Sequence, residues 1–287
     1  MASLKKTLEA PIPRPLLWVG TPCLAILLIV VFVFLGFPYS KFIPFASQAL
    51  ERISGNEIRI GEIQPRLTLG GPGFSINEVS WAAEGQPPIE FDKLKIRPAW
   101  STAWLRAEPA FVIDVTSPLL RVDGTVFLGE GPGFDGAISI LDLELLPKSP
   151  NSPFSLTGAI SATGQVALIN GEPSGAVEFE ATSGSASHRA VPIPLEYELI
   201  QGRIEMGGES WLSLHDLRLD GPLFSAAATG SISRPEGDLP APIDIGVKVD
   251  VKNGPFRLIL SGLGINLDAG GRASFNVGGT VQSPDLR

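Results

Sequence analysis

The residue types best suited to acid–base and metal chemistry are scarce in this sequence. There are two histidines, and His188 lies in a run of serine, glycine and alanine. His215 directly precedes Asp216 in a segment with the alternation of a β-strand, where successive side chains point to opposite faces. Neither histidine therefore has a neighbour that would complete a catalytic pair or a set of metal ligands. We expect no catalytic residue, no metal-binding residue and no enzymatic activity.

Two glycine-rich stretches, 70–73 and 129–133, have the composition of loops that cradle phosphate groups. A phosphate-binding loop of that kind ends in Lys followed by Ser or Thr, opens a helix and uses its backbone N–H groups as donors. Both stretches lack that ending, and Pro72 and Pro132 each remove one donor. We interpret them as turns, so no cofactor is expected.

The composition favours short strands over long helices. The 287 residues include 32 glycines and 26 prolines, with 44% hydrophobic and 18% charged residues. The formal charge of -8 disfavours binding to the negatively charged phosphate backbone of nucleic acid. We therefore exclude nucleic acid as a partner. Cys23 is the only cysteine, so no disulfide framework is expected.

An uncharged stretch of 26 residues between Arg14 and Lys41 dominates the N-terminal part. Its core at 16–37, at ~1.5 Å per residue, is roughly 33 Å long, and a bilayer's hydrocarbon is ~30 Å thick. The length favours a retained transmembrane helix over a cleaved signal peptide. The cations at Lys5, Lys6 and Arg14 predict a cytoplasmic tail at 1–15, with the rest of the chain in the periplasm of a bacterial inner-membrane protein.

A short amphipathic helix is predicted directly after the apolar stretch, at 40–54. Its apolar positions recur at spacings of three and four, from Phe42 and Phe45 to Leu50 and Ile53. Two roles fit this pattern equally. The helix either lies on the bilayer or plugs one end of the following domain, or it covers a sheet edge.

From 56 to 287 the apolar residues recur at every second position. This alternation predicts a mainly β domain with an elongated, curved antiparallel sheet. Glu178 with Glu180, and Asp244 with Asp250, fall on the hydrated face. Shorter strands are predicted elsewhere, including 256–260, and loops at 147–153, 183–191 and 234–242. The apolar face is either the core of a sandwich or the lining of an open groove. Its candidate residues are Val177, Phe179, Ile243, Ile245, Val247, Val249 and Val251.

The order of these parts resembles the type II secretion system protein N (GspN) family. The stretches that carry the resemblance are IQPRLTLGGPGFSINEVSW at 63–81, FDKLKIRPAWSTAWL at 91–105, LTGAISATGQVALINGEPSG at 156–175, VPIPLEYELIQGRIEM at 191–206 and LSLHDLRLDGPLFSAAATGSI at 212–232. The resemblance implies a non-catalytic inner-membrane accessory component of the type II protein secretion system. Its partners would be the lipid bilayer, through 16–37, and other secretion components.

A second resemblance concerns the strand pattern alone. Asp142-Leu143 and Asp216-Leu217, each followed by a glycine-containing strand, are similar to AsmA-like envelope proteins, which are membrane-anchored β-grooves associated with lipid movement. This resemblance implies the alternative function of a lipid-binding or lipid-transfer module, with phospholipid as the ligand on an AsmA-like groove or open sandwich.

Overall fold

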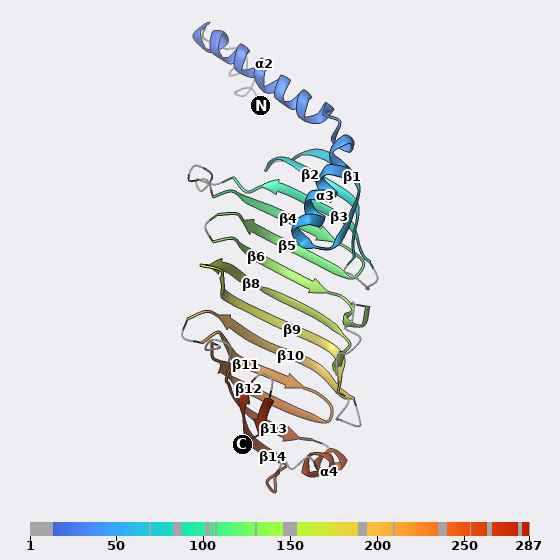
Figure 1. Cartoon of the computed structure of the whole chain (residues 1–287), viewed down its shortest axis with the longest axis vertical. Coiled ribbons are helices and arrows are strands. Elements are labelled where there is room, and N and C mark those ends of the chain that lie inside the picture. The colour runs from blue at the N-terminus through green and yellow to red at the C-terminus, as the bar shows by residue number, and fades with distance from the viewer. Residues whose placement is uncertain are drawn as a thin grey trace, which may run out of the picture.

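The computed structural model describes residues 14–68, 70–82, 88–100, 104, 106, 108–129, 131–145, 154–188, 194–208, 210–234, 240–252, 254–262, 266–280 and 283–286. The chain begins with α2 (Arg14–Gly36), which projects away from the rest of the molecule (Figure 1). It continues through η1 (Tyr39–Phe42) into α3 (Ile43–Ser54). Together these two short helices cover the whole range predicted for the amphipathic helix, 40–54.

α3 is an end-capped helix that packs against the first strand of the sheet. Pro44 stands in its first turn, where the missing N–H costs nothing. Gly55 ends it with a φ of 69°, and its N–H donates to the Glu51 carbonyl at 2.8 Å. The Ile58 N–H donates to Glu51 Oε1 at 3.4 Å, which ties the helix to the strand that follows.

No one helix of the described chain is both long and apolar enough to cross a bilayer. The segments Pro22–Gly36 and Tyr39–Arg52 are joined at a bend of 59°. Only together do they have the length and apolar composition of a membrane span. The prediction of a single spanning helix at 16–37 is not supported by this geometry.

The rest of the described chain is dominated by one antiparallel sheet, with the strands crossing its long axis (Figure 1). Neighbouring strands follow chain order throughout, except that β7 pairs with β9 beside β8. The strands are β1 (Glu57–Thr68), β2 (Gly71–Ala82), β3 (Ile89–Pro98), β4 (Ala110–Thr116), β5 (Leu120–Phe127), β6 (Gly133–Ile140), β7 (Phe154–Leu156), β8 (Ala159–Ile169), β9 (Glu172–His188), β10 (Leu195–Met206), β11 (Leu212–Asp220), β12 (Phe224–Ile232), β13 (Ile243–Val251), β14 (Arg272–Thr280) and β15 (Ser283–Leu286).

The sheet is open and forms a single layer. β1 pairs only with β2, and β15 only with β14, among the described strands, so the two edges do not meet. No second sheet packs on it within the described residues, so the alternative of a closed sandwich core is wrong and the mainly β prediction is confirmed. The chain exposes 19151 Å², whereas a compact monomer of 30.4 kDa exposes about 12,000 Å². A layer with two accessible faces explains the excess.

Three local predictions change in the structure. Residues 256–260, predicted as a strand, belong to the helix α4 (Gly254–Gly262). The predicted loop at 183–191 is strand as far as His188, and its remainder lies outside the described residues. The loop at 147–153 and the middle of the loop at 234–242 also lie outside them. A short 3-10 turn, η3 (Leu143–Leu145), follows β6.

Candidate functional site

The strand register places the candidate apolar residues on one face of the sheet. Directly paired residues of antiparallel strands point to the same side. Val177 pairs with Ile204, Ile204 with Leu214, Leu214 with Gly230, and Gly230 with Ile245. Phe179 alternates with Val177, and Ile243, Val247, Val249 and Val251 alternate with Ile245, so all seven share this face.

The row of directly paired residues that contains Val177 and Ile245 continues to the other end of the sheet and includes no polar side chain. We call it the central row, and every neighbouring pair in it is a direct cross-strand pair. Its members, from β1 to β14, are Pro65, Phe74, Ile96, Ile113, Gly124, Gly136, Gly164, Val177, Ile204, Leu214, Gly230, Ile245 and Val277. Thirteen strands at ~4.8 Å spacing make this apolar face about 58 Å long.

The row one residue away points to the opposite face and is polar except at Ala137. Its members, from β1 to β11, are Gln64, Ser75, Lys95, Asp114, Asp123, Ala137, Thr163, Glu178, Arg203 and His215. The row ends where β11 bulges at Asp216, whose φ is 49°. One face of the layer is therefore apolar and the other hydrated across most of the strands.

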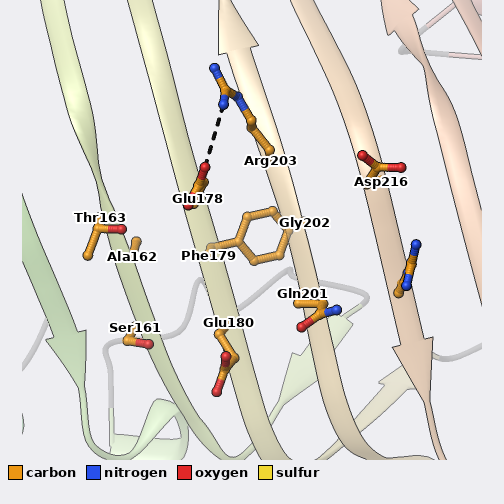
Figure 2. A pocket seen from close by; sticks show the side chains of 11 residues that line it. Ser161, Ala162, Thr163, Glu178, Phe179, Glu180, Gln201, Gly202, Arg203 and Asp216 are labelled. Atoms are coloured by element: carbon orange, nitrogen blue, oxygen red, sulfur yellow. Dashed lines mark ion pairs between the residues drawn. The ribbon is translucent and has the colours of Figure 1, made fainter.

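Ion pairs on the polar face are exposed and add little stability. Arg203 and Glu178, on neighbouring strands, form an ion pair (Figure 2). Their atoms are 3.5 Å apart, and they line an open hollow of about 650 Å³. Arg203 also pairs with Glu205 at 2.8 Å, and His215 Nε2 lies 3.5 Å from Glu205. Side chains this accessible contribute about 0–1 kcal/mol per pair. We interpret this cluster as a hydrated surface.

Glycines in the central row let the strands approach closely on the apolar side. A Cβ added to Gly124 would lie 2.6 Å from the Asp135 carbonyl oxygen and 2.6 Å from the Phe134 ring. One added to Gly136 would lie 2.5 Å from the Gly124 Cα. Ordinary side chains would push these strands apart, so the glycines permit the sheet to bend toward its apolar face.

Aromatic side chains connect the apolar face to the N-terminal helices. The ring of Phe74, in the central row, has its centroid 5.4 Å from that of Phe34 in α2 and 5.2 Å from that of Tyr39. The Tyr39 hydroxyl donates to the Phe34 carbonyl at 2.9 Å, which fixes the bend between α2 and η1. The apolar surface of α2 is thus continuous with the apolar face of the sheet.

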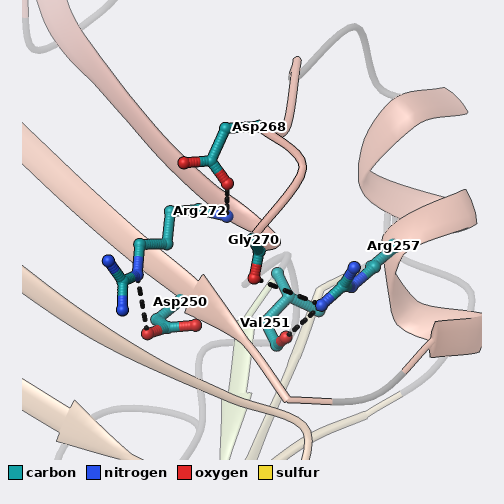
Figure 3. A network of polar contacts seen from close by, with 6 residues as sticks. All are labelled: Asp250, Val251, Arg257, Asp268, Gly270 and Arg272. Carbon is teal, nitrogen blue, oxygen red and sulfur yellow. Dashed lines mark hydrogen bonds and ion pairs between the residues drawn. The ribbon is translucent and has the colours of Figure 1, made fainter.

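At the far end, α4 covers one corner of the same face. Phe256 is buried and stacks on Phe224 with centroids 5.1 Å apart, above the fully buried Val251. Figure 3 shows the polar contacts that hold this corner, with Arg257 Nη2 donating to the Gly270 carbonyl at 3.3 Å. Between the two ends, the described residues place no other helix on the apolar face.

The turn after α4 is ordered by Asp268. Its Oδ1 accepts the Arg272 N–H at 2.8 Å, and Arg272 Nε donates to Asp250 at 3.3 Å (Figure 3). The hydrogen bond from the Arg272 N–H holds the pKa of Asp268 below its usual value, with further help from the backbone at 270–271 and the Arg272 charge.

No family model, curated protein or solved structure compared with the chain matches it. The described residues contain no group of three or more His, Cys, Asp or Glu side chains that could hold a metal ion. Sequence reasoning missed the N-terminal half of the apolar face. The alternation at 134–140 was the available signal, because Phe134, Ile138 and Ile140 alternate there with the polar or small residues at 135, 137 and 139.

Proposed function

We propose that this protein is a membrane-anchored, non-enzymatic protein of the bacterial cell envelope that holds lipid acyl chains on the apolar face of its sheet. The observation that carries this proposal is the central row, which crosses thirteen strands without a polar side chain and which no described helix covers between its ends. A monomeric soluble protein rarely leaves an apolar surface of this length in water. Acyl chains supply a cover that needs no hydrogen bonds.

The energetics favour this ligand. Burying a methylene group completely contributes about 0.8 kcal/mol. A chain lying on an open face has about half of its surface covered, so ~14 methylenes would gain about 6 kcal/mol. The face, at about 58 Å, is roughly four times the ~15 Å hydrocarbon thickness of one leaflet, so it has room for several phospholipids end to end.

The anchor in this proposal is α2, with the tail at 1–15 cytoplasmic and the sheet periplasmic in the inner membrane. Support comes from the uncharged stretch between Arg14 and Lys41, since no one described helix meets the length and composition of a span by itself. Phe34 and Tyr39 pack on Phe74, so lipid leaving the bilayer would meet an aromatic surface that leads onto the central row.

Two neighbouring substitutions on β13 test the lipid proposal. Val247 faces the apolar side and Lys248 the hydrated side, so Val247→Glu and Lys248→Glu add the same side chain to opposite faces. The full chain is purified from membranes and washed with excess detergent, and its phospholipid is counted by phosphate analysis and mass spectrometry. We expect retained phospholipid in the native chain and in Lys248→Glu, and a loss in Val247→Glu. Equal phospholipid in all three, or none in the native chain, would contradict the proposal.

The second candidate function is the one implied by the secretion-family resemblance, a non-catalytic accessory component of the type II secretion system. The open edges at β1 and β15 favour it, because an unpaired strand edge can accept a strand from a partner. Copurification of other secretion components, with impaired secretion in a deletion strain, is the expected result. Unaltered secretion and no such copurification would count against it.

A further inference from the structure

Two tryptophans, Trp100 and Trp104, pack together in the segment that follows β3. Trp100 is 61% exposed and lies 5.4 Å, between ring centroids, from Trp104. Trp104 donates from Nε1 to the Ala99 carbonyl at 2.8 Å and packs edge-on against Phe111, 5.6 Å away. The pair is therefore held in place on one side and open to the surroundings on the other.

Arg66 and Arg97, on the polar face of the sheet, and Leu67, on the apolar face, flank this cluster at the turn between β1 and β2. A Cβ added to Gly71 would lie 2.5 Å from Trp100 Nε1, and one added to Gly70 would lie 2.8 Å from the Arg97 guanidinium. Both side chains thus lie on the turn, whose flanking Leu67 is 49% exposed. We define the tryptophan corner by its residues, Arg66, Leu67, Arg97, Trp100 and Trp104.

The corner is locally basic in an acidic protein. Arg66, Arg97 and the nearby exposed Arg106 form no ion pair with an acidic side chain in the described part of the chain. The hollow that Arg66 and Arg97 line also contains Lys95, which pairs with Asp114, and Asp123. The whole chain carries a formal charge of -8. Exposed tryptophan, leucine and arginine together suit the headgroup region of a bilayer, where aromatic rings are half solvated and arginine meets phosphate.

The corner lies at the level that a bilayer surface would have. Phe34, near the end of α2, packs on Phe74, and Gly71 is three residues from Phe74 along β2. At ~3.3 Å per residue, Gly71, beside Trp100, and Phe74, beside Phe34, are about 10 Å apart along β2. If α2 crosses the bilayer, as proposed above, the corner is within reach of the headgroups of the same leaflet.

We infer that the tryptophan corner is a second membrane contact, which rests in the headgroup region of a bilayer containing anionic phospholipid. The inference uses the proposed anchor only for the position of the bilayer. It orients the sheet, because the corner and α2 together fix two points of the domain on the membrane surface.

Fluorescence quenching by brominated lipid tests this inference in the full chain. The chain is reconstituted in vesicles of phosphatidylcholine and phosphatidylglycerol with bromine on the acyl chains. One variant keeps Trp100 and Trp104 and carries Trp18→Phe, Trp81→Phe and Trp211→Phe. A matched control keeps only Trp211, which is 42% exposed in the turn between β10 and β11, about 34 Å along the sheet from β3.

We expect the Trp100/Trp104 emission to shift to the blue and to lose intensity on brominated lipid, and the Trp211 emission to do neither. Adding Arg66→Gln and Arg97→Gln should reduce the quenching, as should 1 M salt, which shortens the screening length from about 10 Å to about 3 Å. Unquenched Trp100 and Trp104, or equal quenching of Trp211, would overturn the inference. Alkaline carbonate extraction of the same samples reports on the α2 anchor separately, so the two failures are distinguishable.

Discussion

Replacing Phe256 with alanine should destabilise the corner where α4 meets the sheet. Phe256 is 5% exposed, stacks on Phe224 and contacts the best-buried part of the sheet around Val251. Removing a buried phenylalanine costs 3–5 kcal/mol in a closed core, and this cluster is covered on one side only. We therefore expect a loss of about 3 kcal/mol. Leu258, on the same helix, is 77% exposed, so Leu258→Ala should change stability by less than about 0.5 kcal/mol.

Hydrogen exchange is the appropriate assay, because a sheet in which strands contact only their neighbours can open locally. In Phe256→Ala the amides of β12 and β13 beside α4 should exchange about a hundredfold faster than in the native chain, while those of β4 and β5 stay unchanged. Leu258→Ala should match the native chain throughout. A change of less than tenfold in Phe256→Ala, or equal changes in both variants, would refute the assignment of α4 to the apolar face.

Three further predictions concern single side chains. Tyr197 is 3% exposed and its hydroxyl donates to the Thr157 carbonyl at 2.6 Å, so Tyr197→Phe should lower the free energy of unfolding by about 1–2 kcal/mol in urea denaturation. Gly124→Val should disrupt the sheet, as read by circular dichroism, whereas Gly254→Ala, which meets no atom within 4 Å, should not. Because the pKa of Asp268 is lowered in the folded chain, its contribution to the stability of the fold is complete above the ordinary aspartate pKa. That stability is lost as the pH falls through the lowered pKa. The difference in thermal midpoint between the native chain and Asp268→Asn should therefore vanish on acidification, and a constant difference would contradict this.

Local pattern was enough to predict individual strands and the face that each buries. The alternation of Ile245 and Val247 with Gly246 and Lys248 could only be a strand with one apolar side, and it is β13. The run Phe256 to Leu260 was ambiguous, because a short apolar segment fits either a strand or a helix. Gly254 and Pro255 at its start, in positions that suit the first turn of a helix, were the signal for α4.

Pairing between strands could not be predicted from the sequence, and the apolar face depends on it. In β1 the apolar residues occupy every second position up to Ile60, and the series resumes one position out of step at Ile63. The shift lies opposite Glu78, whose φ is 56°. The bulge at Asp216 similarly lets Leu214 and Leu217 share a face. Whether the sheet closes was equally inaccessible, since a closed core and an open face use the same residues. The tryptophan corner joins residues from β1, β3 and the segment after β3, so only the fold reveals it.

Photo-crosslinking at two adjacent positions of β9 tests the central claim most directly. Val177 and Glu178 are one residue apart and point to the apolar and the hydrated face. A benzophenone amino acid is placed at each position in the full chain in cells, and covalent adducts are identified by mass spectrometry after irradiation. Acyl chains on the apolar face predict phospholipid adducts at Val177 and none at Glu178. Adducts at neither position, or equally at both, would contradict a lipid-binding face.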